Sequence, residues 1–117
     1  MLAKANRVVR GADYKAVVRK GFRLSAENTV IYVRVESGGA SSSDRGARFG
    51  FIVAKNVGSA TVRNTVRRRL KAAAFDLLAS APAGADFVVR ALPASAQAPW
   101  TTLHAEMSRA IHKAGTR

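Results

Sequence analysis

The side chains whose types and spacing suggest chemistry lie in residues 55–78, and they are cationic. Wound as an α-helix from about residue 61, at about 100° per residue, this stretch places two rows of polar side chains next to each other. The rows are Arg63, Arg67 and Lys71 in one, and Asn64 and Arg68 in the other. Arginine offers forked donors that match pairs of phosphate oxygens, and its planar group also stacks on nucleobases. The spacing therefore indicates a surface that binds a polyanion.

No acidic residue offsets this charge between Lys55 and Phe75. Like charges four residues apart cost a helix a few tenths of a kcal/mol each, so local stability does not explain the segment. A merely solvated basic face is the plainer alternative, since most charge runs are of that kind. The whole chain favours a partner, because 20 Lys and Arg against 7 Asp and Glu give a net charge of +13 and a pI near 11.6. Such a balance indicates nucleic acid, or less strongly an anionic membrane surface.

Length and composition limit the architecture to one domain. The chain has 117 residues, of which 48% are hydrophobic, enough for a single folded core. It has no cysteine, and His104 and His112 have no acidic residues arranged around them, so neither a disulfide nor a metal site is expected. No window approaches the roughly 18 apolar residues of a membrane span. Residues 1–14 lack the apolar core of a signal peptide, so the expected location is the cytoplasm.

The helix with the two cationic rows has an apolar stripe on its other side. The stripe consists of Val62, Val66, Leu70, Ala73 and Leu77. A shorter helix is predicted earlier in the chain, with Asp13 as its cap and Gly21 at its end. Its apolar positions are Tyr14, Val17 and Val18. The residues alone leave open whether Tyr14 belongs to the core or to a binding surface.

Two segments with alternating or apolar residues are predicted to be strands that each present an arginine. Residues 29–36 place Tyr32 and Arg34 on one face and apolar residues on the other. An aromatic and an arginine on one face suit base stacking and phosphate contact, although a half-solvated strand explains them equally well. Residues 86–91 form a shorter strand with Arg90 opposite its apolar residues.

A further strand and a last helix complete the predicted elements. Residues 48–55 are expected to pair antiparallel with residues 29–36 across a flexible Gly- and Ser-rich loop at about 37–48. The last helix, at about 99–114, has its own apolar stripe, in which Trp100 is expected to anchor the core.

The order α-β-β-α-β-α predicts an α+β sandwich, with a small sheet and helices packed against it. Residues 1–117 then form a single RNA-binding domain. A cleft is expected on the sheet face that presents Tyr32, Arg34 and Arg90.

One continuous segment resembles the protein subunit of bacterial ribonuclease P. That family has a strand ending in lysine, a glycine turn, and Arg-Asn followed by a basic pair on the next helix. From Lys55 to Arg68 this chain reads KNVGSATVRNTVRR. Further similar segments are Asn6-Arg7, Asp13-Tyr14 before Gly21, residues 30–33 and residues 87–91. The resemblance covers about residues 6–92, and the last helix matches in position more than in residues.

The resemblance implies an α-β-β-α-β-α fold with a left-handed βαβ crossover, as in one domain of a small-subunit ribosomal protein. It also implies that the chain binds a catalytic RNA and the 5′ leader of precursor tRNA. The ribonucleoprotein would remove that leader endonucleolytically, with Mg²⁺ bound mainly by RNA. The residues implied for the catalytic RNA are Lys55, Arg63, Asn64, Arg67, Arg68 and Lys71. Those implied for the leader are Tyr14, Val18, Tyr32, Arg34 and Arg90.

The chain departs from the family's pattern at three positions. Asn56 stands where a second lysine is common, and Thr65 stands where a basic residue often follows Arg-Asn. Val18 stands where the family often has phenylalanine. Arg69 is expected to restore part of the missing charge.

No residue is expected to be catalytic or to bind metal by itself. A protein nuclease needs a general base with an acid, or carboxylates that hold Mg²⁺, and the seven acids here are scattered along the chain. The expected partners are the catalytic RNA and precursor tRNA, without a membrane, and the chain is expected to be monomeric without RNA. The alternatives are a small basic ribosomal or RNA-chaperone protein without a processing role, and a nuclease that acts without RNA.

Overall fold

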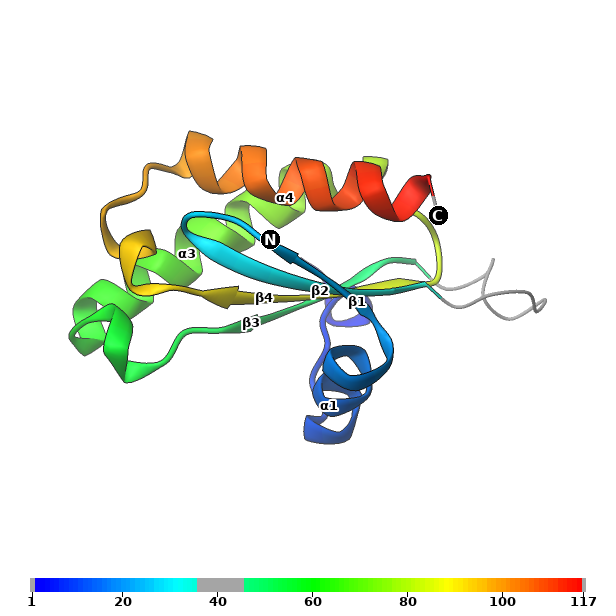
Figure 1. Ribbon diagram of the computed structural model, residues 1–117, viewed down its shortest axis with the longest axis horizontal. Helices are drawn as coiled ribbons and strands as arrows, with labels where there is room; N and C mark the ends of the chain where they lie inside the picture. The colour runs from blue at the N-terminus through cyan, green and yellow to red at the C-terminus, as the bar shows by residue number, and fades with distance from the viewer. Residues whose placement is uncertain (1, 36–45, 117) are drawn as a thin grey trace.

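The computed structural model describes residues 2–35 and 46–116, which form a four-stranded sheet with helices on both faces (Figure 1). The strands are β1 (Phe22–Ser25), β2 (Thr29–Val35), β3 (Arg48–Ile52) and β4 (Ala85–Ala91). The main helices are α1 (Gly11–Lys20), α3 (Ala60–Leu77) and α4 (Trp100–Gly115). In Figure 1, α3 and α4 lie together on one face of the sheet and α1 lies on the other. No helix within these two ranges is both long and apolar enough to cross a membrane.

The hydrophobic core lies between the sheet and the pair of helices α3 and α4. Alternate strand residues belong to it, among them Ile31, Phe49 and Phe87, which are all at most 2% exposed. The rings of Phe49 and Phe87, on neighbouring strands, stack with their centroids 4.9 Å apart. The helices contribute Val66, Leu70, Ala73, Leu77, Leu103, Met107, Ala110 and Ile111. The predicted apolar stripe of α3 is confirmed, and that of α4 is confirmed from Leu103 onward. Because α3 is held by its stripe, its cationic side faces outward.

Trp100 does not anchor the core as predicted. Its side chain is 37% exposed, and its ring lies against His104 with the centroids 4.6 Å apart. Trp100 is the first residue of α4, and Leu103 is the first residue of that helix to be buried in the core. The apolar stripe of α4 therefore begins one turn later than the sequence suggested.

The predicted antiparallel pairing of β2 with β3 is wrong. The strand order is β1-β2-β4-β3, so β4 lies between them, antiparallel to β2 and parallel to β3. Residues 85–89 of β4 are all buried, so this strand needs a neighbour on each side and cover on both faces. The predicted flexible loop before β3 falls mainly at residues 36–45, outside the described residues, and its flexibility stays a prediction.

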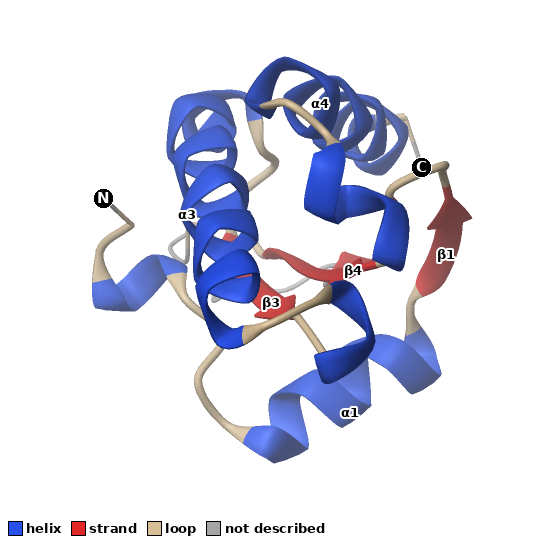
Figure 2. Ribbon diagram, turned by 90° about the vertical axis from the view of Figure 1, so that its left-hand side faces the viewer, coloured by secondary structure: helices blue, strands red, loops and turns tan. Residues whose placement is uncertain are grey.

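The connection from β3 through α3 to β4 joins two neighbouring parallel strands. Figure 2 looks along these strands with their carboxyl ends toward the viewer. β3 lies to the left of β4, and α3 lies above and to the left of them, on the face that α4 also covers. The crossover is therefore left-handed, against the general preference for right-handed connections. The α+β fold is confirmed, with the short strand β1 added at the edge beside β2. With only four residues, β1 was too short for its alternation to be recognised.

Helix α1 begins earlier than predicted. It starts at Gly11 after Arg10, and no side chain caps it. Asp13 lies in the first turn, where its carboxylate approaches the guanidinium of Arg48 at 3.6 Å. Gly21 ends the helix as predicted, and its N–H donates to the carbonyl oxygen of Val17 at 2.9 Å. Asp13 therefore ties α1 to the sheet instead of capping it.

The close approach of α1 to β2 at Gly21 can be tested by adding one methyl group. In Gly21→Ala the new Cβ would collide with the carbonyl oxygen of Val33 and lie 2.6 Å from that of Val17. We expect the free energy of unfolding in urea to fall by about 2 kcal/mol. Gly11→Ala is the matched control, because a Cβ there meets nothing within 4 Å, and it should be neutral or stabilising by about 0.5 kcal/mol. Equal stability of the two variants would contradict the packing of α1.

Candidate nucleic-acid interface

A glycine turn sets the direction of α3, the helix that bears the cationic rows. After β3 the chain makes a short 3-10 turn, Lys55–Val57, and then passes through Gly58 at φ 156°. A Cβ at Gly58 would lie 2.9 Å from the side chain of Val62, so the turn needs glycine both for its backbone angle and for space. The Oγ of Ser59 then accepts a hydrogen bond from the N–H of Val62 at 3.4 Å and caps α3. The first turns of α3 are thereby fixed relative to the end of β3.

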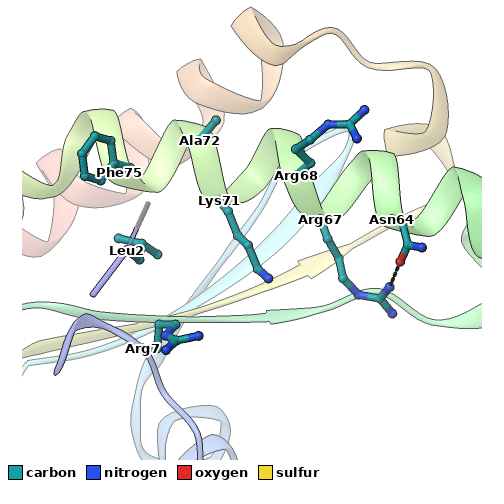
Figure 3. A pocket seen from close by; sticks show the side chains of 8 residues that line it. All are labelled: Leu2, Arg7, Asn64, Arg67, Arg68, Lys71, Ala72 and Phe75. Atoms are coloured by element: carbon teal, nitrogen blue, oxygen red, sulfur yellow. Dashed lines mark hydrogen bonds between the residues drawn. The ribbon is translucent and has the colours of Figure 1, made fainter. Parts of the chain in front are cut away.

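The outer side of α3 forms one wall of a cavity of about 540 Å³, which we call the cationic groove. Its lining residues are Leu2, Arg7, Asn64, Arg67, Arg68, Lys71, Ala72 and Phe75 (Figure 3). Four of the eight are Lys or Arg, and none is acidic. The Nη1 of Arg67 donates to the Oδ1 of Asn64 at 2.8 Å, which orients both polar groups. A groove with this lining attracts anions, and its guanidinium groups suit phosphate oxygens.

Four of the five acids in the described ranges are engaged elsewhere. The guanidinium of Arg48 forms two hydrogen bonds of 2.9 Å to the buried carboxylate of Asp86. Glu106 accepts hydrogen bonds from the side chains of Asn28, at 2.8 Å, and Thr29, at 2.6 Å. The carboxylates of Asp13 and Asp76 face Arg48 and His104, respectively. Within the described ranges no ion pair joins an acid to the outer side of α3, so the groove keeps its positive potential.

The structure brings together four of the six residues predicted for the catalytic RNA. Asn64, Arg67, Arg68 and Lys71 share the groove, whereas Lys55 and Arg63 are not part of its lining. Lys55 is exposed at the end of β3. Arg63 is partly buried, and its Nε is inaccessible to water and has no hydrogen-bond partner among the described residues.

Arg69 does not restore charge to this side of α3, contrary to expectation. Arg69 follows Arg67 by two residues, which is roughly 200° around the helix, so Arg69 points to the opposite flank of α3. There its Nη1 donates to the carbonyl oxygen of Ala98 at 3.1 Å, in the segment that leads into α4. The charge lost at Thr65 is therefore not replaced by Arg69.

The residues predicted for the leader lie on the opposite side of the sheet, around α1. Tyr32 and Arg34 of β2 and Arg90 of β4 point to the face that α1 covers, away from the core residues of the same strands. Tyr14 is partly buried, and its hydroxyl oxygen accepts a hydrogen bond from the N–H of Phe51 at 3.2 Å. Val18 is 38% exposed. The predicted cleft at this face stays a prediction.

Gly50 explains how Tyr14 can approach the sheet so closely. A Cβ at Gly50 would lie 2.7 Å from two ring carbons of Tyr14. The ring of Tyr14 therefore covers the backbone of β3 and has a fixed orientation, with its hydroxyl oxygen at the N–H of Phe51. The sequence left open whether Tyr14 belongs to the core or to a binding surface. The structure answers this in part, because Tyr14 packs on the sheet yet is not fully buried.

Sequence reasoning missed Arg7 and Phe75 as groove residues. Phe75 lies four residues after Lys71 and so on the outer side of α3, a signal that helical spacing could have revealed. Arg7 belongs to the N-terminal segment, which pairs with the edge strand β3; the N–H of Val8 donates to the carbonyl oxygen of Phe49 at 2.9 Å. No local pattern predicts that pairing between residues so far apart in the chain.

The fold and this surface define a small, basic α+β protein with an uncompensated cationic helix. The family model described as Ribonuclease P matches residues 2–115. The ribonuclease P protein component of Clavibacter michiganensis subsp. michiganensis is 46% identical over 114 residues, which are 97% of this chain and 96% of that protein. The chain belongs to the family of ribonuclease P protein components.

Solved structures agree on the fold. A mutant RNase P protein from Staphylococcus aureus superimposes with a TM-score of 0.80 at 21% identity, covering 97% of this chain and 90% of that one. The RNase P protein from Thermotoga maritima gives a TM-score of 0.75 at 20% identity, covering 92% and 96%. The family resemblance read from the sequence is thus confirmed.

Proposed function

We propose that this chain is the protein subunit of ribonuclease P, and that it supports removal of the 5′ leader from precursor tRNA by binding two RNAs. The outer side of α3 binds the catalytic RNA, and the sheet face beside α1 holds the leader. The observation that supports this assignment most strongly is the cationic groove of a chain that belongs to the ribonuclease P protein family. Family membership names the assembly, and the groove gives a physical reason for RNA to bind at α3.

The catalytic RNA is assigned to α3 because that helix offers both charge and access. Arg68 and Lys71 are exposed, and Arg67, which lines the same groove, is held by its hydrogen bond to Asn64. Phosphates that bind these side chains release their counterions, which makes affinity depend steeply on salt. Lys55 and Arg63 extend the same surface toward the end of β3 in this proposal.

The leader is assigned to the other face of the sheet. Tyr14 and Tyr32 supply rings on which unstacked bases can lie, and Arg34 and Arg90 supply cations for the phosphates between them. Arg90 is exposed, and its register partner on β2 is Val30, two residues from Tyr32 on the same face. Val18, at 38% exposure, adds an apolar edge.

The chemistry of cleavage is assigned to the RNA. Four of the described acids are engaged with Arg48, His104, or Asn28 and Thr29, so they are not arranged as a general base and acid around one substrate. Among residues 2–35 and 46–116, no group of three or more His, Cys, Asp and Glu side chains is placed to hold a metal ion. The described residues therefore do not fit a Mg²⁺ ion held by the protein, and Mg²⁺ is assigned mainly to RNA phosphates. The protein screens phosphate repulsion and positions the leader.

The first test is a processing assay. Adding the chain to a ribonuclease P catalytic RNA and precursor tRNA at low Mg²⁺ should raise the rate of leader removal severalfold, because the cations offset repulsion between the two RNAs. The protein without catalytic RNA should leave the precursor intact. No gain in processing would refute the proposed function, and cleavage by the protein alone would move the chemistry into this chain.

The role of α3 is tested by the salt dependence of binding. Replacing Arg68 and Lys71 by glutamine should reduce the slope of log affinity for the catalytic RNA against log salt by about 1.5 to 2 units, given roughly one counterion per lost phosphate contact. The charge-matched control is Arg69→Gln with Arg109→Gln, which removes two cations outside the groove and should leave the slope nearly unchanged. Equal slopes for the two double variants would mean that α3 faces solvent in the complex.

The role of the sheet face is tested by comparing precursor and mature tRNA. Tyr14→Ala and Tyr32→Ala should each weaken binding of the leader-bearing precursor by the catalytic RNA–protein complex about tenfold, through a lost stacking contact. Affinity for mature tRNA should not change. Tyr14→Phe is the matched control, because it keeps the ring and removes only the hydroxyl. An equal loss for precursor and mature tRNA would favour a general RNA-chaperone or ribosomal role.

A further inference from the structure

Phe75 is a large aromatic side chain that the core does not use. It is 53% exposed, although its neighbours Ala73, Ala74 and Leu77 on α3 are buried. Single exposed apolar residues are common and need no explanation by themselves. Phe75 differs because it lies inside the cationic groove, where Arg7, Arg67, Arg68 and Lys71 supply positive charge around it. An aromatic ring among cations suits a particular kind of ligand.

The groove has an apolar end and a cationic end. Figure 3 shows the ring of Phe75 at one end, above Leu2, with the small side chain of Ala72 between Phe75 and Arg68 along the helix. Lys71 extends from α3 toward the side of the groove where Arg7 lies. Arg68 and Arg67 lie further from Phe75, toward the N-terminal end of the helix. Lys71 precedes Phe75 by about one helical turn, or about 6 Å along the axis, a spacing comparable with the length of one nucleotide.

The charge of the groove limits what can occupy it. An apolar segment of a protein would cover Phe75 but would also take Arg7 and Lys71 out of water without a counter-charge, which is costly. A simple polyanion would satisfy the cations and leave the aromatic ring unused. A nucleotide offers a flat π-face for the ring and a phosphate for the cations, so it complements both ends.

We propose that the groove is a subsite for one unpaired nucleotide of the bound RNA, with its base stacked on Phe75 and its phosphates held by Arg7 and Lys71. This inference rests on the proposed function, since it places the nucleotide in the RNA that α3 binds. The other rings discussed for RNA, Tyr14 and Tyr32, lie on the opposite side of the sheet, so this subsite is separate from the leader face.

Binding to a ribonuclease P catalytic RNA tests the stacking contact. Phe75→Ala should lower affinity about tenfold, because one base–aromatic contact is lost, while the salt slope stays at its wild-type value because no cation is removed. Phe75→Tyr should retain affinity, since it keeps the ring. Trp100→Ala is the matched control, because it removes another exposed aromatic of the chain, outside the groove, and should leave affinity unchanged.

A fluorescent version of the ring reports stacking directly. The chain has a single tryptophan, so the double variant Phe75→Trp with Trp100→Phe moves that fluorophore into the groove. Saturating catalytic RNA should quench its emission strongly, whereas inorganic polyphosphate, which has charge but no bases, should bind without comparable quenching.

The outcomes separate this inference from the function on which it rests. If the wild-type chain does not bind the catalytic RNA, both proposals fail. If it binds, but Phe75→Ala has wild-type affinity and the groove tryptophan is not quenched, the subsite alone is refuted. Equal quenching by polyphosphate and RNA would also overturn it, because the ring would then sense charge and not a base.

Discussion

The positive charge on the outer side of α3 has no acidic partner within the described part of the chain. Much of the structure depends on acids that bind other groups instead. The buried carboxylate of Asp86 is committed to Arg48, and Asp13 approaches the same guanidinium from α1. Glu106 binds Asn28 and Thr29 at the start of β2. The acids thus join elements to one another on parts of the fold away from the groove. A helix so poor in acids is slightly unstable by itself, so it must be held by its packing.

That packing depends on β4. Because β4 is buried on both faces and lies between β2 and β3, it gives the sheet a central strand against which α3 and α4 can close the core. Val66 and Leu70 of α3 are fully buried there, which holds the rotation of the helix about its axis. The same rotation sends Arg68 and Lys71 outward and turns Arg69 to the flank beside Ala98. The direction of each cation is thus set by the residues beneath it.

The sequence was informative wherever the deciding interactions are local. The apolar stripe and the cationic rows of α3 both follow from a period of 3.6 residues, so Leu70 could be placed on the buried side and Lys71 on the cationic side without a structure. The alternation along β2 likewise placed Tyr32 and Arg34 on one face. Family resemblance supplied the left-handed crossover, which local pattern could not, since handedness depends on how β3, α3 and β4 are arranged in space.

Contacts between distant segments were beyond that reasoning. The position of β4 between β2 and β3 depends on its burial on both faces, and the bridge from Arg7 to Phe49 joins residues that no short pattern relates. The pairing of Arg48 with Asp86 spans 38 positions, and no short pattern indicates that this arginine has a structural partner. The groove was missed for the same reason, because one of its walls comes from α3 and the other from the N-terminal segment beside β3.

The account depends on the outer side of α3 being the surface that meets the catalytic RNA. A reconstruction of the chain bound to that RNA and to precursor tRNA, at a resolution that shows side chains, tests this most directly. We predict phosphate oxygens within hydrogen-bonding distance of Arg67 and Arg68, with the leader on the opposite side of the sheet. A complex in which the outer side of α3 faces solvent and the RNA contacts another surface would contradict the account.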